Sequence, residues 1–587
     1  MNYLITRIIL ILFLISLSPL AGITNNKTKN RENLVFYNGP DIHIEGSKIL
    51  DNVSIGPEIP ITGLSGFYDW QTNGDCKRQI YYFNGSILHA IYMTSTDSLQ
   101  VNPSRQTRYS FSSNGGLNWD LSAIVPPGRS GYGYLTVDSG LIGPQAVIVN
   151  HYGGPVKSYI HTDAFPGLGS FTYYPSNSVR NYIWPQANLM DNRNVLVSGK
   201  TYNDNVSTDT LAVQIFRPSS GQWIGQPQFF RSGASDHFDM RIANATGPNG
   251  KAVLIMSPVY DHGGSFGANR IFYWTSNNYG VSWSGPNLMY DTQIDADGDT
   301  SKPWIGLDAV YDKVGNFFVA FNTVSLSGEY STAKIWLNKN GVQNKILVKN
   351  SQITGAMTSA VGTHMEDVCS MDWPSISLSE YSDAVFCAYS VAKQNDTVNG
   401  FNSMDIYISY ANAGNLSPSN NRIQITNGTD DERFVSLNRI SFGDFNRKIP
   451  AVYQKDPQPG TSAPDHNDNA PLSRSSLIYR EIELTVPLLN IINNLSEQIP
   501  ESYKLQQNFP NPFNPSTNIR FDIPKSGNVR ILIYDISGKL VETLIDESLS
   551  PGTYEINWNG DRFASGVYFY NLEAEGFNQT RKMLLIK

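Results

Sequence analysis

The chain has 587 residues, of which 16% are charged, while glycine (48), tyrosine (32) and proline (32) are abundant. This composition is typical of a turn-rich β protein. The 43 Lys and Arg residues against 51 Asp and Glu residues give a net charge of −8, which excludes the basic footprint of a nucleic-acid-binding protein. The mean hydropathy of −0.29, with one apolar run at the N-terminus, also excludes a polytopic membrane protein.

The N-terminal residues have the order of regions found in a secretory signal peptide. Arg7 is followed by an apolar run over 8–17 and by small residues over 18–22. A membrane anchor is the disfavoured alternative, because the run is shorter than the ~20 residues that span a bilayer. We therefore expect a signal peptide over 1–22 and a mature chain outside the cytoplasm without a transmembrane segment.

A unit of two short strands joined by a polar turn recurs along the chain. Its copies begin at Arg78, Gly133, Trp184, Phe238, Pro303, Trp373 and Phe434. Further strands of alternating polarity, separated by Gly, Asn and Asp turns, bring each unit to the strand number of a propeller blade. We therefore expect an all-β fold with a seven-bladed β-propeller over 23–486, with separate β-sandwiches as an alternative. The last copy lacks one strand, and we expect a spare strand near 49–55 to complete it, which leaves no open sheet edge.

Two of the predicted turns share a motif that carries a family resemblance. The motif residues are Ser112, Asn114, Gly116 and Trp119 in one copy and Ser276, Asn278, Gly280 and Trp283 in the other. In such a turn the Ser and Asn side chains bond to the backbone, the glycine adopts a positive φ, and the tryptophan packs beneath. The motif resembles the Asp box, or BNR repeat, of sialidase-like propellers, with Asn in place of the usual Asp. The resemblance implies a structural role for these residues.

The resemblance covers most of residues 50–486 as a fold, and an inner-strand phrase at 302–308 is also similar to the family. It does not imply sialidase chemistry. The first substrate-binding arginine of that family stands in a Phe/Tyr-Arg-Ile-Pro phrase, and the nearest string here, at 216–218, lacks the Ile and is expected to form a turn. The family has six blades, so a six-bladed propeller stays open as the alternative to seven.

The C-terminal residues predict a small antiparallel β-sandwich over 503–587, behind a linker over 487–502. Alternating polarity and Gly or Pro turns place strands at 519–523, 529–534, 552–558, 566–572 and 581–586. The proline-rich phrase at 508–515 and the closing residues 582–587 resemble the type A sorting domain of the type IX secretion system. The resemblance implies that the type IX machinery recognises this domain and delivers the protein to the outer-membrane surface or the medium.

One dense acidic loop is a candidate metal site. Asp295, Asp297 and Asp299 alternate with small residues, and Gly298 allows a sharp turn. Carboxylates at this spacing suit an oxygen-ligated cation such as Ca²⁺ in a structural role. The terminal bidentate Glu of an EF-hand is missing, so a solvated acidic turn stays open as the alternative.

A second cluster is a candidate catalytic or ligand-binding site. His364, Glu366 and Asp367 precede a predicted inner strand, where propeller loops form the mouth of the axial channel. These side-chain types can act as acids, bases or ligands. Ordinary loop residues are the alternative reading.

The three cysteines do not make a disulfide scaffold. Their odd number leaves at least one unpaired within the chain. Cys369 and Cys387 flank strands predicted to be adjacent, so a bridge between them stays open outside the cytoplasm. Cys76 is expected to be a buried structural thiol.

The leading functional hypothesis is binding of an extracellular glycan, or another surface ligand, at the channel mouth, where aromatic rings would stack on sugars. The alternatives are a glycan-degrading enzyme, of glycoside hydrolase or lyase type, and a structural surface-assembly protein. An enzyme should place two carboxylates, or a tyrosine with a carboxylate, at the mouth. A binder should show aromatics and neutral amides there, and an assembly protein a large apolar flank.

Overall fold

A computed structural model describes the chain from Val53 onward, with internal gaps. The residues outside the description are 1–52, 69–70, 72–77, 121, 127, 141–142, 153–155, 178–180, 204–205, 232–238, 260–269, 296–297, 326–331, 354–355, 357–368, 399–400, 420–421, 444–445, 461–471, 486–491, 497–498 and 561–562. The predicted signal peptide over 1–22 therefore lies outside the described residues. Among the residues that are described, no helix is long and apolar enough to cross a membrane.

Residues 53–485 contain seven sheets of four or five strands, built almost entirely from antiparallel pairs. Sheet 1 consists of β3 (Ile80–Phe83), β4 (Ile87–Thr94), β5 (Gln106–Ser112) and β6 (Ala123–Ile124). Sheet 2 consists of β7 (Ser130–Gly140), β8 (Gly143–Tyr152), β9 (Lys157–Asp163) and β10 (Phe171–Pro175). Sheet 3 consists of β11 (Tyr182–Leu189), β12 (Val195–Asn203), β13 (Val206–Arg217) and β14 (Gln222–Phe230).

The remaining sheets of this part follow in chain order. Sheet 4 consists of β15 (Asp239–Thr246), β16 (Ala252–Val259), β17 (Arg270–Ser276) and β18 (Ser284–Asp291). Sheet 5 consists of β19 (Gln293–Ile294), β20 (Thr300–Tyr311), β21 (Phe317–Ser325), β22 (Lys334–Lys339) and β23 (Gln343–Lys349). Sheet 6 consists of β24 (Met371–Ser379), β25 (Ala384–Val398), β26 (Phe401–Asn412), β27 (Ile423–Gln424) and β29 (Ile440–Ser441). Sheet 7 consists of β28 (Asp431–Leu437), β30 (Asn446–Asp456), β31 (Ser475–Thr485), β1 (Val53–Ile55) and β2 (Ile59–Gly66).

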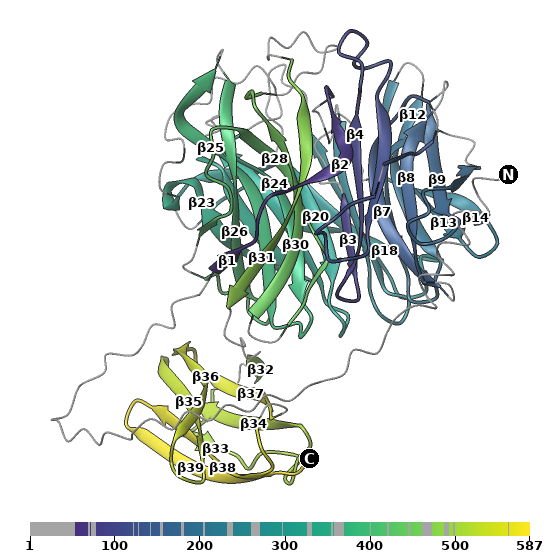
Figure 1. Cartoon of the computed structure of the whole chain (residues 1–587). Coiled ribbons are helices and arrows are strands. Elements are labelled where there is room, and N and C mark those ends of the chain that lie inside the picture. The colour runs from purple at the N-terminus through teal and green to yellow at the C-terminus, as the bar shows by residue number, and fades with distance from the viewer. Residues whose placement is uncertain are drawn as a thin grey trace, which may run out of the picture. The chain divides into compact units, whose positions relative to one another are not determined.

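Each sheet packs face to face against the next, and the last packs against the first (Figure 1). An apolar cluster fills each of these contacts; for example, Tyr109 of sheet 1 clusters with Leu135 of sheet 2, and Leu88 of sheet 1 clusters with Leu477 of sheet 7. The alternation of apolar side chains along each strand supplies both faces of every sheet. The sheets therefore close into a ring, the arrangement of a β-propeller.

An N-terminal strand completes the last sheet, as the strand count predicts. β1 pairs antiparallel with β31, with Val53 opposite Leu484 and Ile55 opposite Ile482. β2 pairs with the same strand and buries Leu64 against sheet 1. Sheet 7 is thus built from both ends of the ring, which leaves no unpaired edge at the junction.

The two turns with the Ser-Asn-Gly-Trp motif have the predicted hydrogen bonds. The Ser276 hydroxyl donates to Asn278 Oδ1 (2.9 Å) and accepts from the Gly280 amide (3.0 Å). The Ser112 hydroxyl accepts from the Gly116 amide at the same distance, 3.0 Å, and Gly116 has a φ of 87°. A Cβ on Gly116 would lie 2.2 Å from the Tyr479 ring, so only glycine fits there. The membership of these turns in the Asp-box family stays a prediction.

Replacing Ser276 with alanine is expected to lower the free energy of unfolding by about 1–2 kcal/mol, because the buried Gly280 amide loses its acceptor. Urea unfolding followed by tryptophan fluorescence measures the change. Ser284, exposed at the start of β18, is the matched control, and Ser284→Ala should change stability little. Equal stability of the Ser276→Ala variant and the unmodified protein would contradict the structural role of the serine.

The C-terminal residues form a β-sandwich of two sheets. One sheet has the order β32 (Ile492–Ser496), β37 (Gly552–Asn559), β34 (Ser516–Ile523) and β33 (Lys504–Leu505). The other has the order β36 (Leu540–Leu549), β35 (Gly527–Asp535), β38 (Gly566–Ala574) and β39 (Phe577–Leu585). Both contribute to one core, in which Trp558, Ile531 and Tyr570 are buried. The five predicted strands correspond to β34, β35, β37, β38 and β39.

The predicted linker over 487–502 needs a correction. It contains β32, which pairs antiparallel with β37 and places Ile492 opposite Ile556. A strand that covers the open edge of an existing sheet is held by backbone hydrogen bonds, so its sequence carries little pattern. The sandwich therefore includes a strand from the range that the sequence assigned to the linker.

Candidate functional site

The first strands of five sheets carry a bulge that holds an aromatic residue. The aromatic residues in these register shifts are Tyr132, Trp184, Trp304, Trp373 and Phe434. Tyr132, Trp184, Trp373 and Phe434 have positive φ values of 48–53°. A bulge bends the strand and redirects a side chain. These bulges lie near the beginnings of the first strands. We call the end of the ring where these strands begin the mouth.

The redirected aromatic residues pack together across the mouth. Tyr132, Trp373 and Phe434 belong to one buried cluster, although they come from sheets 2, 6 and 7, and Trp184 packs against it. The ring centroids of Trp373 and Phe434 are 4.4 Å apart, and those of Tyr132 and Trp184 are 6.3 Å apart. The aromatic groups at the centre of the mouth are therefore mostly buried and are not a platform for stacking on a ligand.

Cationic side chains lie over these aromatic rings. The pairs are Arg105 over Tyr132 (5.3 Å), Lys200 over Trp184 (4.9 Å), Lys302 over Trp304 (5.3 Å) and Arg433 over Trp373 (5.8 Å). Cation–π contacts of this length are attractive and stronger when desolvated. Burial lowers the pKa of Lys302 to about 8. Four cationic side chains thus lie at the mouth, one of which, Arg433, is paired with Asp431.

Arg105 is the centre of a group that we call the Arg105 site, made of Tyr68, Asn102, Arg105, Arg129 and His151. Arg105 Nη1 donates to Asn102 Oδ1 (2.5 Å) and to the Tyr68 hydroxyl (3.4 Å), and Nη2 lies 3.3 Å from His151 Nε2. Arg129 Nη2 donates to the same Asn102 oxygen (2.9 Å), so two guanidinium groups converge on one amide. In the part of the chain that the structure describes, no carboxylate contacts Arg105. A carboxylate or another oxyanion is the kind of group that a guanidinium such as that of Arg105 binds most strongly.

Three tyrosines of sheet 2 form a row beside the Arg105 site. Tyr152, Tyr159 and Tyr173 lie on the face of sheet 2 that is turned toward sheet 1, with centroid distances of 5.2 Å and 6.3 Å along the row. Tyr173 is 55% exposed, and Tyr152 and Tyr159 are half-buried. A Cβ on Gly128, the neighbour of Arg129, would lie 3.0 Å from the Tyr152 ring. This tyrosine row therefore begins next to Arg129 and offers flat, partly exposed rings.

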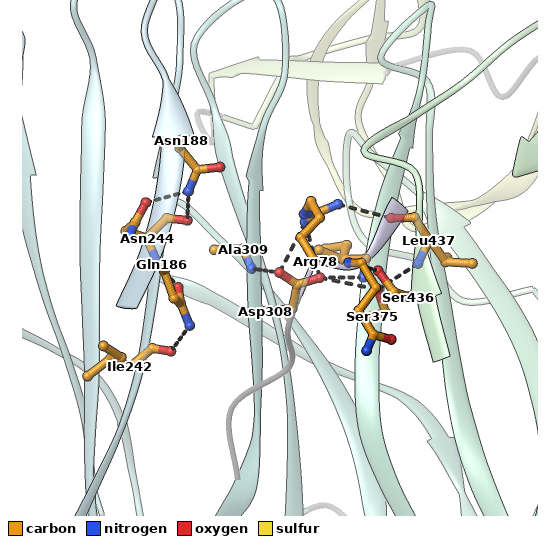
Figure 2. A network of polar contacts seen from close by, with 12 residues as sticks. Arg78, Gln186, Asn188, Ile242, Asn244, Asp308, Ala309, Ser375, Ser436 and Leu437 are labelled. Atoms are coloured by element: carbon orange, nitrogen blue, oxygen red, sulfur yellow. Dashed lines mark hydrogen bonds and ion pairs between the residues drawn. The ribbon is translucent and has the colours of Figure 1, made fainter. Parts of the chain in front are cut away.

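The interior of the ring is filled by a network of paired polar groups (Figure 2). Arg78 at the start of sheet 1 pairs with Asp308 of sheet 5 at 3.1 Å, and it also donates to the Leu437 carbonyl of sheet 7 at 3.1 Å. The Ile376 amide and the Ser375 hydroxyl of sheet 6 donate to Asp308 Oδ2 (3.0 and 3.4 Å). One ion pair thus connects sheets that are not neighbours in the ring.

Side-chain amides connect the first strands of sheets 3 and 4 inside the ring. Gln186 donates to the Ile242 carbonyl (2.7 Å) and Asn188 donates to the Asn244 carbonyl (2.8 Å), which connects sheets 3 and 4 (Figure 2). Because buried polar groups are costly unless paired, these contacts hold the first strands in register. Most of the groups in this network bond to one another inside the ring, whereas the Arg105 site lies at the mouth, so we consider the mouth as the place for a ligand.

The structure gives the predicted acidic loop a partner within the chain. Asp299 pairs with the Lys334 ammonium at 2.8 Å, and Asp295 contacts the same ammonium and accepts from the Ser301 hydroxyl at 2.6 Å. Asp297 lies outside the described residues. Within the described ranges, no group of three His, Cys, Asp or Glu side chains is arranged to bind a metal. A structural Ca²⁺ at this loop stays a prediction.

The remaining predicted residues are the His364 cluster and the three cysteines. His364, Glu366 and Asp367 lie outside the described residues, as does Cys76. Cys369 and Cys387 are buried free thiols, so the bridge left open by the sequence is not formed. Burial raises the pKa of both thiols well above the ordinary value, because a thiolate would lose its hydration.

A buried carboxyl pair between sheets 6 and 7 has no signature in the sequence. Asp405 accepts from Gln424 Nε2 (2.8 Å) and lies 3.6 Å from Lys393 Nζ, and Glu432 lies 3.8 Å from Lys455 Nζ. Burial, and then the charge of Asp405, raises the pKa of Glu432. Both residues are almost fully buried, at 3% and 0% exposure. The pair is therefore a buried polar layer between two sheets and has no open face toward a substrate.

Comparison with known families identifies the C-terminal part. Residues 507–587 match the family model described as a secretion system C-terminal sorting domain. This match covers the β-sandwich from β34 to β39 and confirms the resemblance found in the sequence. A protein with this domain is secreted or held at the outer-membrane cell surface. A comparison with curated proteins gives no match.

Several solved structures are similar to the chain at low identity. A sialidase from Trypanosoma rangeli is 11% identical, with 90% of this chain and 89% of that chain covered and a TM-score of 0.32. An exo-β-1,3-galactanase from Phanerochaete chrysosporium is 10% identical, with 91% and 99% covered and a TM-score of 0.29. A thermostable family-43 glycoside hydrolase is 12% identical, with 49% and 95% covered and a TM-score of 0.29. We draw no conclusion about this chain from TM-scores in this range.

Proposed function

We propose that the chain is a secreted or surface-held β-propeller of seven blades that binds an acidic extracellular glycan at its mouth. The seven sheets would be the blades, and the C-terminal sandwich would engage the type IX secretion machinery. The ligand would be a glycan with carboxylate or sulfate groups. Arg105 and Arg129 would bind its acid group, and the tyrosine row would contact its sugar rings.

The observation that carries the proposal is the environment of Arg105. Its partners Asn102, Tyr68 and His151 orient the guanidinium group without supplying a carboxylate. A guanidinium group oriented in this way binds a carboxylate or sulfate through charge-assisted bonds, which are stronger than neutral ones. The adjacent tyrosine rings favour a sugar over a simple inorganic anion, because flat rings stack on pyranose faces.

The alternatives receive less support from the described residues. A glycan-degrading enzyme needs acid and base groups within reach of the substrate. The carboxyl pair described above, Asp405 and Glu432, is buried between two sheets. A surface-assembly protein would show a broad apolar flank, whereas the exposed apolar side chains, such as Leu117 and Val281, stand at separate turns.

Glycan retention by the purified protein tests the proposal. The panel contains polygalacturonate, sulfated algal galactan and a sialylated oligosaccharide, with unsubstituted glucan and arabinan as neutral members. We expect at least one acidic glycan to bind, and Arg105→Gln to weaken that binding about 10- to 100-fold, because a bond to a charged group contributes about 1.5–3 kcal/mol. Tyr173→Ala, at an exposed position, should weaken it several-fold. The release of reducing ends should stay at background.

Arg270→Gln is the matched control, because it removes the same charge at a position on sheet 4. The Arg270 side chain is 49% exposed. It should bind the acidic glycan like the unmodified protein. Retention of no acidic glycan, or equal losses for Arg105→Gln and Arg270→Gln, would overturn the proposal. Reducing-end release above background would establish the enzyme alternative instead.

A further inference from the structure

We propose that a cavity between sheets 2 and 3 is a second ligand site, which takes a neutral saccharide of one or two sugar units. Its volume is about 370 Å³, within the range typical of small-molecule sites. Its lining is mixed, and its polar part consists of Asp138, Gln145, Thr162 and Thr172 of sheet 2 with Arg193 and Ser219 from turns of sheet 3. The inference is independent of the proposed glycan site at the mouth.

Strand register builds the floor of this cavity. Thr162 of β9 lies opposite Thr172 of β10, and Asp138 of β7 lies opposite Gln145 of β8. Directly opposite residues of an antiparallel pair point to the same face, so the two hydroxyls stand side by side. This face is turned toward sheet 3, whereas the tyrosine row occupies the other face of the same sheet. The two sites are therefore separated by the thickness of sheet 2.

Arg193 forms a preorganised wall of the cavity. Its Nε and Nη2 atoms donate to the two carboxylate oxygens of Asp138, each at 3.0 Å. The Asp138 side chain is 5% exposed and that of Arg193 is 48% exposed, so the carboxylate anchors the guanidinium group from inside. This bidentate pair cancels the charge of both groups and fixes the plane of the guanidinium. Arg193 Nη1 is not used in the pair and remains available as a donor.

Asp163, the second acidic residue of the cavity, also has hydrogen-bond partners within the chain. Asp163 is buried, and its carboxylate oxygens accept from the backbone amides of Gly169 (3.2 Å) and Ser170 (3.1 Å). It caps the turn that follows β9. Because Arg193 is paired with Asp138 and Asp163 is itself a carboxyl group, an anion would find no unpaired cationic group in the cavity. The groups of the cavity therefore favour a neutral ligand over an anionic one.

The uncommitted groups have the chemistry of saccharide recognition. The hydroxyls of Thr162, Thr172 and Ser219 and the Oε1 atom of Gln145 have no hydrogen-bond partner among the described residues. Hydroxyls can both donate and accept, which matches the hydroxyls of a sugar. Pro218 at the rim offers an apolar surface for the C–H groups of the ring. Few polar groups at fixed positions, with apolar contacts between them, are typical of a small-molecule site.

Titration calorimetry of the full protein with neutral disaccharides tests this inference. The probes are cellobiose, maltose, lactose and arabinobiose, with glucuronate as a charged comparison. We expect one disaccharide to bind and the charged sugar not to compete for this site. Thr162→Val with Thr172→Val should raise its Kd at least tenfold, because valine keeps the shape of threonine and removes the hydroxyl. Ser219→Trp, at an exposed turn, should have the same effect by filling the cavity from the rim.

The Arg105→Gln variant separates the two sites and should leave disaccharide binding unchanged. Thr162→Ser keeps a hydroxyl and should retain most of the affinity. Binding of none of the four disaccharides would overturn the inference, and so would binding that neither the double valine variant nor Ser219→Trp weakens. Loss of disaccharide binding in Arg105→Gln would also overturn it, because that result would place the sugar at the mouth.

Discussion

Replacing Asp308 with asparagine is expected to lower the free energy of unfolding by about 3–5 kcal/mol, the usual cost of removing one partner from a buried ion pair. Arg78 and Asp308 have side-chain exposures of only 2% and 8%. Asparagine keeps the shape of aspartate and removes its charge. The Arg78 guanidinium would then be a buried charge without a counterion, and the Ile376 amide would lose a charged acceptor.

The loss of stability in Asp308→Asn should extend beyond the immediate neighbours of Asp308, because the residue connects several sheets. Asp308 accepts from sheet 1 through Arg78 and from sheet 6 through Ser375 and Ile376. These sheets would lose a common anchor, so the loss should spread to the packing of the first strands. An exposed pair such as Arg270 with Asp291 contributes at most about 1 kcal/mol.

Urea unfolding of Asp308→Asn and of the control Asp291→Asn measures the difference between the two positions. The double variant Arg78→Met with Asp308→Leu should recover part of the lost stability, because apolar side chains can replace a buried ion pair. A loss below about 1 kcal/mol in Asp308→Asn would show that water reaches the pair and that the ring interior is open.

The sheets could be predicted from the sequence because each one carries its own turns. A polar turn between two apolar strands is a local signal, and it recurs in every unit, so the strand that closes the last unit follows from counting its strands. The hydrogen bonds of Ser276 and Ser112 are local as well, since each joins residues four apart or closer. Where the pattern was weak, in β32 and β36, the strands lie at sheet edges and the sequence did not predict them.

The Arg105 site could not be predicted, because its members are distant in the sequence. Arg105 is 37 residues from Tyr68 and 46 residues from His151, and only the packing of neighbouring sheets brings these residues together. One local signal was present in the aromatic residues at the starts of the units, such as Trp184 and Trp373. Their positive φ, which turns the side chains into the mouth, cannot be inferred from a bulky residue type that rarely adopts it.

At the acidic loop, too, a contact between residues distant in the sequence could not be predicted. Asp295 and Asp299 looked available for a cation because the stretch between them contains no basic residue. Lys334 lies 35 residues beyond Asp299 and reaches both carboxylates from β22. A spacing pattern describes the ligands that a loop can offer, and only the fold shows which side chains, such as Lys334, reach them from elsewhere in the chain; the Ca²⁺ site itself stays a prediction.

Glu432 is expected to make the protein less stable as the pH rises. Burial, and then the neighbouring charge of Asp405, raises the pKa of Glu432 above its ordinary value of 4.5. Lys455 and Lys393 oppose this shift. Above pH 4.5 the unfolded chain releases the proton and the folded chain keeps it, so the stability that Glu432 contributes is fully present below that pH and is lost as the pH rises through the folded pKa. One such group accounts for at most about 1.4 kcal/mol per pH unit.

Glu432→Gln removes this titration and keeps the shape of the side chain. The variant should match the unmodified protein near about pH 4 and exceed its stability near about pH 8, as measured by urea unfolding at both ends. A residual slope of the same sign should remain, because burial also raises the pKa of Asp405 and brings that of Asp431 to about 6. Glu483→Gln, which makes the same change at a half-buried position of sheet 7, serves as the control. Parallel curves for Glu432→Gln and the unmodified protein would mean that Lys455 holds Glu432 ionised in the fold, and the layer between sheets 6 and 7 would then be an ion pair at every pH in the range.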